Sequence, residues 1–367
     1  MTSPLPLPGR VRDVTASWLN AALAQRFPST RVQDMAVTEV IWGTATKIRV
    51  TVRYSPDSPP DGPPHALCIK GGLDERWVTK PVKLLSRVVG ADFSAAYLAE
   101  ARFYDRMSTH AEVPLPRCYF AGTEADRQGI VILDDLVDLG VSFGDPTRSW
   151  PVDRVAAALE ILAALHAATW GGTISDYPWL PTRPVLGDLL KIMVSYPYWT
   201  THFLLPGAPE LPDELDDRRR VRAAMEKLFA QHSTESRCLT HGDAHVGNTC
   251  VAPDGAPTFI DWQSVYPGPP LDDVAYFVTG ALSVADRRGS ERDLLAHYRS
   301  ELIARGAPAP GADEVWNSYR RYALHGFGWV LCPPVMQPWR NVRAMSERHI
   351  AAILDLESID AVHNWSP

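Results

Sequence analysis

Two kinds of hydrophobic pattern divide this chain of 367 residues near residue 134. Before that point the apolar residues come in short, strand-length segments separated by polar turns. After it they recur at the spacing of three and four residues that marks amphipathic helices. Strands followed by helices, with no repeated βαβ pattern, are typical of the α+β class. We therefore predict a small antiparallel sheet in residues 1–133, a linker at 134–140 and a larger, mainly helical part at 141–367.

The period of each segment gives its expected boundaries. Strands are expected at residues 35–42, 47–54, 66–69, 117–121 and 129–133. Helices are expected at residues 13–27, 92–107, 152–169 and 216–231. In the first helix, Asp13 has a suitable side chain and position for an N-cap, and Pro28 would end the helix. The Gly-Thr-Ala-Thr sequence at 43–46 should join the first two strands as a hairpin.

The composition disfavours several kinds of partner. Lysine and arginine total 36 and aspartate and glutamate total 43, so the formal net charge is −7. A mildly acidic chain has no general attraction for nucleic acid or for an anionic membrane surface. No segment approaches 18 uninterrupted apolar residues, and no N-terminal apolar segment marks a signal peptide. The five cysteines are scattered without a Cys-x-x-Cys pair, which favours a reducing compartment, so we expect a cytoplasmic protein.

The most informative segment is residues 239–263, LTHGDAHVGNTCVAPDGAPTFIDWQ. Three oxygen-bearing side chains stand in it at defined spacing: Asp243, Asn248 and Asp261. After Asn248 come a short strand, a Pro-Asp-Gly turn and a second strand, which together predict a hairpin. Because a hairpin brings its two ends together, it should return Asp261 to the side of Asn248, with Asp243 nearby.

This set of oxygen ligands suits phosphoryl transfer to an alcohol. Mg²⁺ prefers oxygen ligands and keeps waters and substrate phosphates in its shell, which fits Asn248 and Asp261. Asp243 is then free to orient a substrate hydroxyl and to accept its proton. Positioning and charge neutralisation supply most of the catalysis in such reactions. The segment therefore predicts an enzyme that uses Mg²⁺ to transfer a phosphoryl group to an alcohol.

These motifs resemble those of a known family. The sequences HGDAHVGN at 241–248, IDWQ at 260–263 and DVA at 273–275 are similar to the motifs of aminoglycoside phosphotransferases and choline kinases. The Asp-Trp-Gln form is most similar to the ecdysteroid-kinase-like branch of that group. The resemblance has landmarks over residues 35–280 and implies a bilobal, protein-kinase-like fold that phosphorylates small molecules.

The resemblance also implies roles for individual residues. It makes Asp243 the catalytic base and makes Asn248 and Asp261 the magnesium ligands. It further implies that His241 and Asp273 brace the catalytic loop through hydrogen bonds. The helix that carries Leu-His-Ala at 165–167 would pack behind this loop.

On the nucleotide side, the resemblance implies two charged residues and a backbone segment. Lys70, at the end of a strand, would contact the α- and β-phosphates, and Glu100 on the next helix would pair with it. The link between the lobes would contact adenine through its backbone, at Asp134, Asp135 and Leu136. The nucleotide-covering loop has a single glycine in place of a glycine-rich segment, so Thr44 is expected to contact phosphate there.

The acceptor is predicted from the chemistry of the C-terminal region. Residues 264–367 hold 12 acidic, 10 basic and 11 aromatic side chains, so this region lacks the carboxylate excess that a polycationic aminoglycoside would need. We predict instead a small molecule with a hydroxyl group, namely a bulky and partly apolar alcohol. The residues expected around it are His245, Gln263, Trp316, Trp329 and Trp339.

Several alternatives stay open at this stage. An aromatic cage could hold a quaternary ammonium through cation–π attraction, so a choline or ethanolamine kinase is one alternative and an aminoglycoside kinase is another. A nucleotide-binding pseudokinase would lack a catalytic carboxylate or a metal ligand, but every matched position is present. A protein kinase would need an activation segment, for which Gly-Pro-Pro at 268–270 leaves little room after Asp261. The sequence does not determine the oligomeric state or the choice between ATP and GTP.

Overall fold

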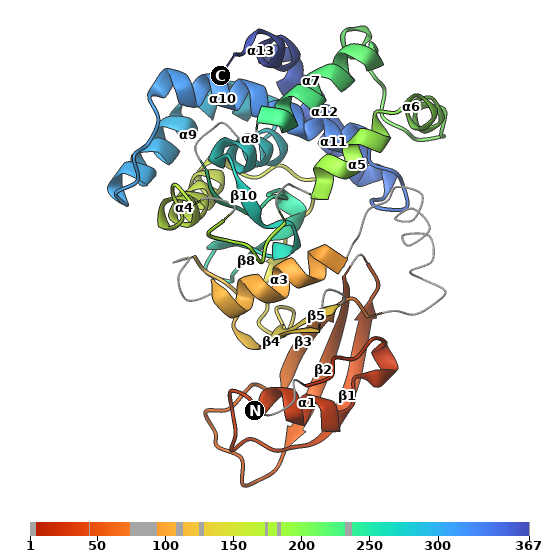
Figure 1. The fold of residues 1–367 in the computed structure, drawn as a ribbon, viewed down its shortest axis with the longest axis vertical. Helices are drawn as coiled ribbons and strands as arrows, with labels where there is room; N and C mark the ends of the chain where they lie inside the picture. The colour runs from red at the N-terminus through yellow and green to blue at the C-terminus, as the bar shows by residue number, and fades with distance from the viewer. Residues whose placement is uncertain are drawn as a thin grey trace. The chain divides into compact units, whose positions relative to one another are not determined.

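The computed structural model describes residues 5–43, 45–73, 94–107, 113–124, 128–172, 175–181, 185–231 and 237–366. The chain divides into two compact units (Figure 1). The first unit comprises Met1–His110, Leu115–Ser142 and the short segment Asp261–Gln263. The second unit comprises Ala111–Pro114, Phe143–Ile260 and Ser264–Pro367.

A five-stranded sheet forms the frame of the first unit (Figure 1). Its strands are β1 (Val32–Ile41), β2 (Thr46–Tyr54), β3 (Ala66–Gly71), β4 (Cys118–Glu124) and β5 (Gln128–Asp134). Their order across the sheet is β1-β2-β3-β5-β4, and each neighbouring pair runs antiparallel. All five expected strands are therefore present, although their ends differ slightly from the predicted ones.

Side chains alternate between the two faces of this sheet because a strand has a period of two. The apolar positions of β2 that are buried in the core are Ile48, Val50 and Val52. They share this core with helix α1 (Ala16–Leu23), which covers that face. Lys47 and Arg49 alternate with these positions and therefore point to the opposite face. The sheet thus separates an apolar face from a face that carries charge.

Helix α1 starts later than the expected helix at residues 13–27. Thr15, not Asp13, is its N-cap, because the Thr15 hydroxyl accepts the backbone N–H of Trp18 at 3.2 Å. Asp13 belongs to a preceding 3₁₀ turn. The prediction of Asp13 is wrong because Asp and Thr are both good N-caps, and the pattern alone does not choose between them. Burial of Val14 in the core accompanies the later start.

Helix α3 (Ser94–Arg106) packs on β4 and β5 of the sheet. The two backbones approach so closely that a Cβ atom at Gly129 would lie 2.1 Å from the carbonyl oxygen of Tyr97. A larger residue at this position would push the helix away from the sheet. This contact matters for function because α3 carries the buried Glu100.

The second unit is mainly helical (Figure 1). Its helices are α4 (Val152–Ala168), α5 (Val185–Met193), α6 (Tyr196–Phe203), α7 (Arg218–Gln231), α8 (Pro270–Ala281), α9 (Val284–Ala304), α10 (Ala312–Tyr322), α11 (Phe327–Val330), α12 (Trp339–Asp355) and α13 (Ser358–Asn364). Its short strands include β7 (Cys238–Thr240), β8 (Thr249–Val251), β9 (Pro257–Phe259) and β10 (Tyr266–Gly268). The two-residue strand β6 (Ser142–Phe143) contains the last residue of one unit's segment and the first of the other's. The expected helices at 152–169 and 216–231 correspond to α4 and α7.

Helix α8 lies in the core of the second unit. All its residues are buried, and it contacts α4, α10 and α12. A helix that is apolar on nearly every side is typical of such a position. Two acids in its first turn, Asp272 and Asp273, are buried with the rest. Buried carboxylates require hydrogen-bond partners, so these two acids must be bonded to neighbouring elements.

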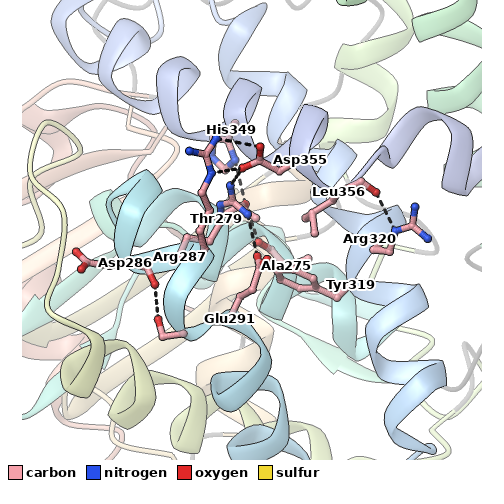
Figure 2. Close-up of polar contacts among 12 residues, drawn as sticks. Ala275, Thr279, Asp286, Arg287, Glu291, Tyr319, Arg320, His349, Asp355 and Leu356 are labelled. Carbon is pink, nitrogen blue, oxygen red and sulfur yellow. Dashed lines mark hydrogen bonds and ion pairs between the residues drawn. The ribbon is translucent and has the colours of Figure 1, made fainter.

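A buried ionic network joins α9 to α10 and α12 (Figure 2). Arg287 of α9 is 1% exposed and donates to Glu291 Oε2 at 2.9 Å and to the carboxylate of Asp355. The Tyr319 hydroxyl donates to the same oxygen of Glu291 at 2.9 Å. Arg288 also binds the carboxylate of Asp355, with distances of 2.7 and 2.9 Å. The charge of the buried arginine is therefore paired, which limits the cost of removing it from water.

The observed order of elements confirms the α+β prediction. The antiparallel sheet lies in the N-terminal part of the chain, and the remainder is mainly helical. Within the described ranges, no helix combines the length and the apolar character that crossing a membrane would require.

Candidate active site

Residues 241–248 form a loop between β7 and β8 of the second unit. Two backbone N–H groups of this loop donate to the carboxylate of Asp273. His241 N lies 2.6 Å from Oδ2, and Gly242 N lies 2.9 Å from Oδ1. Asp273 is 2% exposed and stands in the first turn of α8. A single buried carboxylate therefore fixes the start of the loop to the core helix.

His166 of α4 contacts the same carboxylate. Its Nε2 lies 3.3 Å from Asp273 Oδ2, and its Nδ1 lies 2.7 Å from the hydroxyl of Tyr298 on α9. Both ring nitrogens thus have partners, and the imidazole is fully buried. These contacts suit His166 to supporting Asp273 from within the helical core.

Gly242 has a backbone φ of 77°, in the left-handed region where residues with a Cβ atom are strained. A Cβ atom at this position would also lie 2.1 Å from the carbonyl oxygen of Ser264. The loop can therefore follow this path only with glycine at position 242. Because Asp243 is the next residue along the chain, the backbone conformation of Gly242 sets the position of the Asp243 side chain.

Asp243 has a side chain that is 30% exposed and is oriented by its own loop. The amide nitrogen of Asn248 donates to Asp243 Oδ2 at 2.9 Å and to its backbone carbonyl at 3.0 Å. His245 Nε2 lies 3.7 Å from Asp243 Oδ1. The imidazole is itself fixed, because its Nδ1 accepts the N–H of Gly247 at 3.0 Å. The result is an accessible carboxylate in a fixed orientation, which is suited to accepting a proton.

Asn248 uses its amide nitrogen on Asp243, which leaves the side-chain oxygen Oδ1 for another partner. In the described part of the chain, no group donates a hydrogen bond to this oxygen. The backbone carbonyl of Asn248 accepts the N–H of Ile260 at 2.9 Å, which closes the hairpin of β8 and β9 as predicted. Asp261 is the next residue along the chain. Amide and carboxylate oxygens are the ligands that Mg²⁺ prefers.

Asp261 packs with the first unit, where it binds two lysines of the sheet. Lys70 of β3 places its Nζ 2.8 Å from Asp261 Oδ1. The same Nζ lies 2.7 Å from both carboxylate oxygens of Glu100. Lys47 of β2 places its Nζ 3.6 Å from Asp261 Oδ2. The structure thus brings Lys70, Glu100 and Asp261 together, as a cluster to which Lys47 also belongs.

The backbone of Asp261 is in the left-handed region, with a φ of 68°. This conformation is uncommon outside glycine, although Asp adopts it more readily than most residues. The following residue anchors it: the N–H of Trp262 donates to Glu100 Oε1 at 3.2 Å, and its ring stacks on Phe103 with 4.3 Å between centroids. Residues held in rare backbone conformations cluster at functional sites.

Burial and charge act against each other on Lys70. Burial lowers the pKa of its ammonium group, but the carboxylates of Asp261 and Glu100 outweigh burial and hold that pKa above its ordinary value. Burial raises the pKa of Glu100, and the ammonium of Lys70 opposes that shift. Lys70 therefore remains a cation in the interior of the first unit, where it can bind an anionic ligand.

Lys47 is the residue that sequence reasoning missed. It stands directly opposite Lys70 in the antiparallel register of β2 and β3. The alternation within β2 could have placed Lys47 on the charged face of the sheet. The register between β2 and β3 could not be read in the same way, because the loop at residues 55–65 that joins them leaves the pairing undetermined.

The predicted linker residues have side chains that are already bonded. Asp134 accepts the Tyr119 hydroxyl at 2.7 Å and a backbone N–H at 2.8 Å. Asp135 is 4% exposed and accepts the Nε–H of Arg49 at 2.9 and 3.0 Å. Leu136 is half-buried. Part of the backbone is bonded as well: the N–H of Asp134 donates to the carbonyl of Arg117 at 3.1 Å, and the carbonyls of Asp135 and Leu136 accept the N–H groups of Leu139 at 3.1 Å and Val141 at 3.2 Å. The contact with adenine that the resemblance implies stays a prediction.

Thr44 and Gln263 are two further residues that the sequence predicts to be in the site. Thr44 is outside the described residues, so its expected contact with phosphate stays a prediction. Gln263 belongs to the first unit, and its side-chain oxygen Oε1 is buried. No described group donates a hydrogen bond to that oxygen. An acceptor atom of this kind could bind a donor group of a ligand.

The tryptophans expected around the acceptor lie in different surroundings. Trp329 is edge-on to His245, with 5.1 Å between ring centroids. Trp339 contacts a histidine of α6 at 5.6 Å. Trp316 lies beneath Arg292 of α9, whose guanidinium carbon is 3.6 Å from the ring centroid. Trp329 thus contacts the loop at residues 241–248, whereas Trp316 packs against α9.

Asp272, the second buried acid of α8, is also bonded. It accepts the hydroxyl of Tyr266 at 2.8 Å and lies 2.6 Å from Nδ1 of His325. Burial lowers the pKa of His325, but Asp272 outweighs burial and raises that pKa above its ordinary value. The ring of His325 in turn stacks on Tyr276 with 4.4 Å between centroids. The carboxylate of Asp272 is therefore committed to the protein interior.

A cavity of ≈ 760 Å³ opens between α10 and α13 of the second unit. Its lining includes Pro270, Glu314, Asn317, Arg321, Asp360 and Trp365. None of the predicted site residues lines it. The chemistry of the catalytic loop, and not the volume of this cavity, therefore identifies the candidate site.

An oriented acid on a braced loop and a lysine–glutamate pair are features that the resemblance to phosphotransferases implies. Residues 75–311 match the sequence profile of the phosphotransferase enzyme family, APH. Because this match spans more than half of the chain, the protein belongs to that family. The prediction of the family, and with it the prediction of a phosphotransferase, is confirmed. No curated protein is similar enough in sequence to count as a match.

Solved structures of phosphotransferases resemble this chain at low sequence identity. A GDP and kanamycin complex of aminoglycoside phosphotransferase APH(2")-IIIa is 12% identical, with a TM-score of 0.48 and coverage of 95% of this chain and 99% of that one. Macrolide 2'-phosphotransferase from Brachybacterium faecium is 15% identical, with a TM-score of 0.44 and coverage of 86% and 91%. Ethanolamine kinase from Plasmodium vivax is 12% identical, with a TM-score of 0.43 and coverage of 90% and 82%.

Proposed function

We propose that this protein is a kinase that transfers the γ-phosphoryl group of ATP to a hydroxyl group of a small molecule, with Mg²⁺ as cofactor. The observation that carries the proposal is the geometry of the catalytic loop. Asp243 presents an oriented and accessible carboxylate beside Asn248, on a loop that Asp273 fixes to the core. Membership of the phosphotransferase family supports the same class of reaction.

The residues present fit a magnesium ion. Asn248 offers an amide oxygen that no described residue uses, and Asp261 offers a carboxylate. Both are hard oxygen ligands, and the remaining positions around Mg²⁺ are commonly filled by water and phosphate oxygens. When bound, the ion would neutralise phosphate charge and orient the transferring group.

Asp243 would act as the general base. Its carboxylate would align the acceptor hydroxyl and accept the hydroxyl proton as the substrate oxygen bonds to the γ-phosphorus. The bond from that phosphorus to the bridging oxygen breaks in the same step, and ADP leaves. The hydrogen bond from Asn248 keeps Asp243 in one orientation, so little reorganisation is needed at the moment of transfer.

The nucleotide would be bound by the charged face of the first unit. Lys70 would contact the α- and β-phosphates, and Glu100 would hold the lysine in position through its 2.7 Å contact. The backbone at 134–136 would contact the adenine ring, as the family resemblance implies, since the side chains of Asp134 and Asp135 are bonded within the protein. The carbonyls of Asp135 and Leu136 each accept one N–H within the protein and would accept a second hydrogen bond from the ligand.

The acceptor we propose is a bulky, partly apolar alcohol. A polycationic sugar would need several available carboxylates near the base. The two acids of α8, Asp272 and Asp273, are already bonded within the protein. The side chain on the catalytic loop beside Asp243 is His245, which contacts the indole of Trp329. An aminoglycoside and a choline-like amine are the alternatives that the assay must separate.

A mixed alcohol library incubated with ATP and Mg²⁺ tests this function directly. The expected result is a mass increase of one phosphate on a bulky alcohol, with ADP released in equal amount. Turnover confined to kanamycin-like sugars would refute the acceptor class but not the reaction. Nucleotide binding without any phosphoryl transfer would indicate a pseudokinase, and transfer only to polypeptides would indicate a protein kinase.

Three variants separate the proposed roles. Asp243→Ala should lower kcat by ~10²–10⁴-fold, the usual contribution of a general base, while nucleotide binding is largely kept. Asp261→Ala should weaken binding of Mg²⁺·ATP as well. Asp254→Ala is the matched control, because this exposed acid serves the turn of the same hairpin, where it accepts the N–H of Ala256. Near-normal turnover in Asp243→Ala would show that another residue is the base.

A further inference from the structure

Two lysines share one carboxylate on the charged face of the first unit. Lys47 and Lys70 are direct partners in the antiparallel pairing of β2 and β3, so their side chains leave the sheet on the same face. Lys70 Nζ lies 2.8 Å from Asp261 Oδ1, and Lys47 Nζ lies 3.6 Å from Asp261 Oδ2. Like charges directly opposite each other destabilise a sheet unless another group compensates them.

Asp261 supplies that compensation for Lys47. Arg49 is the next basic residue on the same face, and it pairs with the carboxylates of Glu39 and Asp135. Lys70 has a second carboxylate of its own, in Glu100. Among the described residues, Lys47 therefore has Asp261 as its charge partner, whereas Lys70 has Glu100 as well.

The two lysines also differ in exposure. The side chain of Lys70 is 4% exposed and is enclosed by its carboxylates, whereas that of Lys47 is 36% exposed. A partly exposed ammonium on a flexible stem can exchange one anionic partner for another at low cost. Lys47 is thus the member of the pair that can move to a ligand.

We infer that Lys47 is a second phosphate-binding residue of the nucleotide site, and that Asp261 holds it until a divalent cation takes that carboxylate. The inference rests on the proposed function. Lys47, Lys70, Glu100 and Asp261 balance one another's charge, with two cations and two anions. A cation bound to Asp261 leaves the lysines in excess, and the phosphates of a nucleotide restore the balance. Lys47 therefore favours the binding of metal and nucleotide together over the binding of either one alone.

This inference gives opposite signs for two binding measurements. Without nucleotide, Lys47 competes with the metal for Asp261, so its removal should tighten metal binding. With nucleotide, Lys47 donates to phosphate, so its removal should weaken binding. A lysine with a merely structural role in the sheet would not produce these opposite effects.

The experiment measures binding, not turnover, on three variants of the full chain. Lys47→Gln removes the charge, and Lys47→Arg keeps it. Arg53→Gln is the matched control, because Arg53 is a cation on the same strand that pairs with the exposed Asp34. Circular dichroism first checks that each variant is folded. Titration calorimetry then gives the Kd of Mg²⁺·ATP and of AMP, and electron paramagnetic resonance gives the Kd of Mn²⁺ alone.

Lys47→Gln should bind Mg²⁺·ATP ~10-fold or more weakly, the loss expected for one hydrogen bond to a charged group. It should bind Mn²⁺ alone roughly 2- to 5-fold more tightly, because an ion pair at a partly exposed site is released. The Kd of AMP should change little in Lys47→Gln, because AMP without a divalent cation leaves Lys47 bound to Asp261. The Arg53→Gln control and Lys47→Arg should bind Mg²⁺·ATP and Mn²⁺ with affinities near wild type. Equal Mg²⁺·ATP affinity in Lys47→Gln and Arg53→Gln would overturn the inference. A wild-type chain that binds no nucleotide would instead overturn the proposed function.

Discussion

Replacing Asp273 by alanine tests whether one buried carboxylate fixes the catalytic loop. Asp273 accepts two backbone N–H groups of the loop, at 2.6 Å from His241 and 2.9 Å from Gly242. It is 2% exposed, so water does not readily replace it. Leaving one buried hydrogen-bond donor without its acceptor lowers the free energy of unfolding by about 1–3 kcal/mol. Two such donors give an expected loss of about 2–6 kcal/mol in the free energy of unfolding.

The effect on activity follows from the same contacts. His241 and Gly242 directly precede Asp243, so release of their N–H groups should let the carboxylate of this proposed base shift. A misplacement of about 1 Å can cost ~10²-fold in rate. We therefore expect Asp273→Ala to lower kcat by ~10²-fold or more at a temperature where the variant is still folded. Asp273→Asn keeps one acceptor oxygen and should fall between alanine and wild type.

Urea denaturation followed by tryptophan fluorescence measures the stability of these variants, and a coupled ADP assay measures kcat. Asp293→Ala is the control, because Asp293 is an exposed acid on α9 in the same unit. The control should match wild type in both assays. The reasoning about the brace would be refuted if Asp273→Ala unfolded within about 0.5 kcal/mol of wild type and kept its kcat, since surface substitutions fall in that range.

Three further predictions concern the loop and the ionic network. Gly242→Ala should abolish turnover at a temperature where the chain remains folded, because a Cβ atom there meets a backbone oxygen at 2.1 Å; near-normal kcat would contradict this. Arg287→Ala should lower the free energy of unfolding by about 3–5 kcal/mol, because it leaves the buried carboxylate of Glu291 without its cation; urea denaturation checks it. Hydrogen bonds from Arg288 help hold the pKa of Asp355 below its ordinary value. The stability that Asp355 contributes is therefore present above its unfolded pKa and lost as pH falls through the folded pKa, so Asp355→Asn should flatten the acid limb of a stability–pH curve below about pH 4.

Local pattern predicted individual strands of the first unit and helices of the second. The period of two in β2 gave a strand at 47–54, and the observed strand is Thr46–Tyr54. The apolar spacing at 152–169 likewise predicted α4, Val152–Ala168. Such segments are predictable because their apolar residues recur with a regular period over many positions. The start of α1 was not predictable, because two residues near it could each serve as an N-cap.

The acceptor residues illustrate a different limit. An aromatic residue with helical spacing has the same pattern whether it faces a ligand, the core or a neighbouring cation. Trp316 and Trp329 stand on neighbouring helices, yet one lies beneath Arg292 and the other contacts His245. Only the packing of α9, α10 and α11 separates these surroundings. The local spacing of aromatic residues does not show how those helices pack.

The cluster around Asp261 shows why a motif predicts residue types better than it predicts their partners. The pattern at 241–263 indicated that Asp261 would be functional, and the resemblance paired Lys70 with Glu100. Neither could indicate Lys47, because Lys70 and Asp261 are 191 positions apart in the chain and the pairing of β2 with β3 sets which lysine stands opposite Lys70. A motif contains the residues that a reaction requires, in a fixed order along the chain. Lys47 belongs to no such motif. Its proposed role depends on strand register and charge balance, which only the folded structure shows.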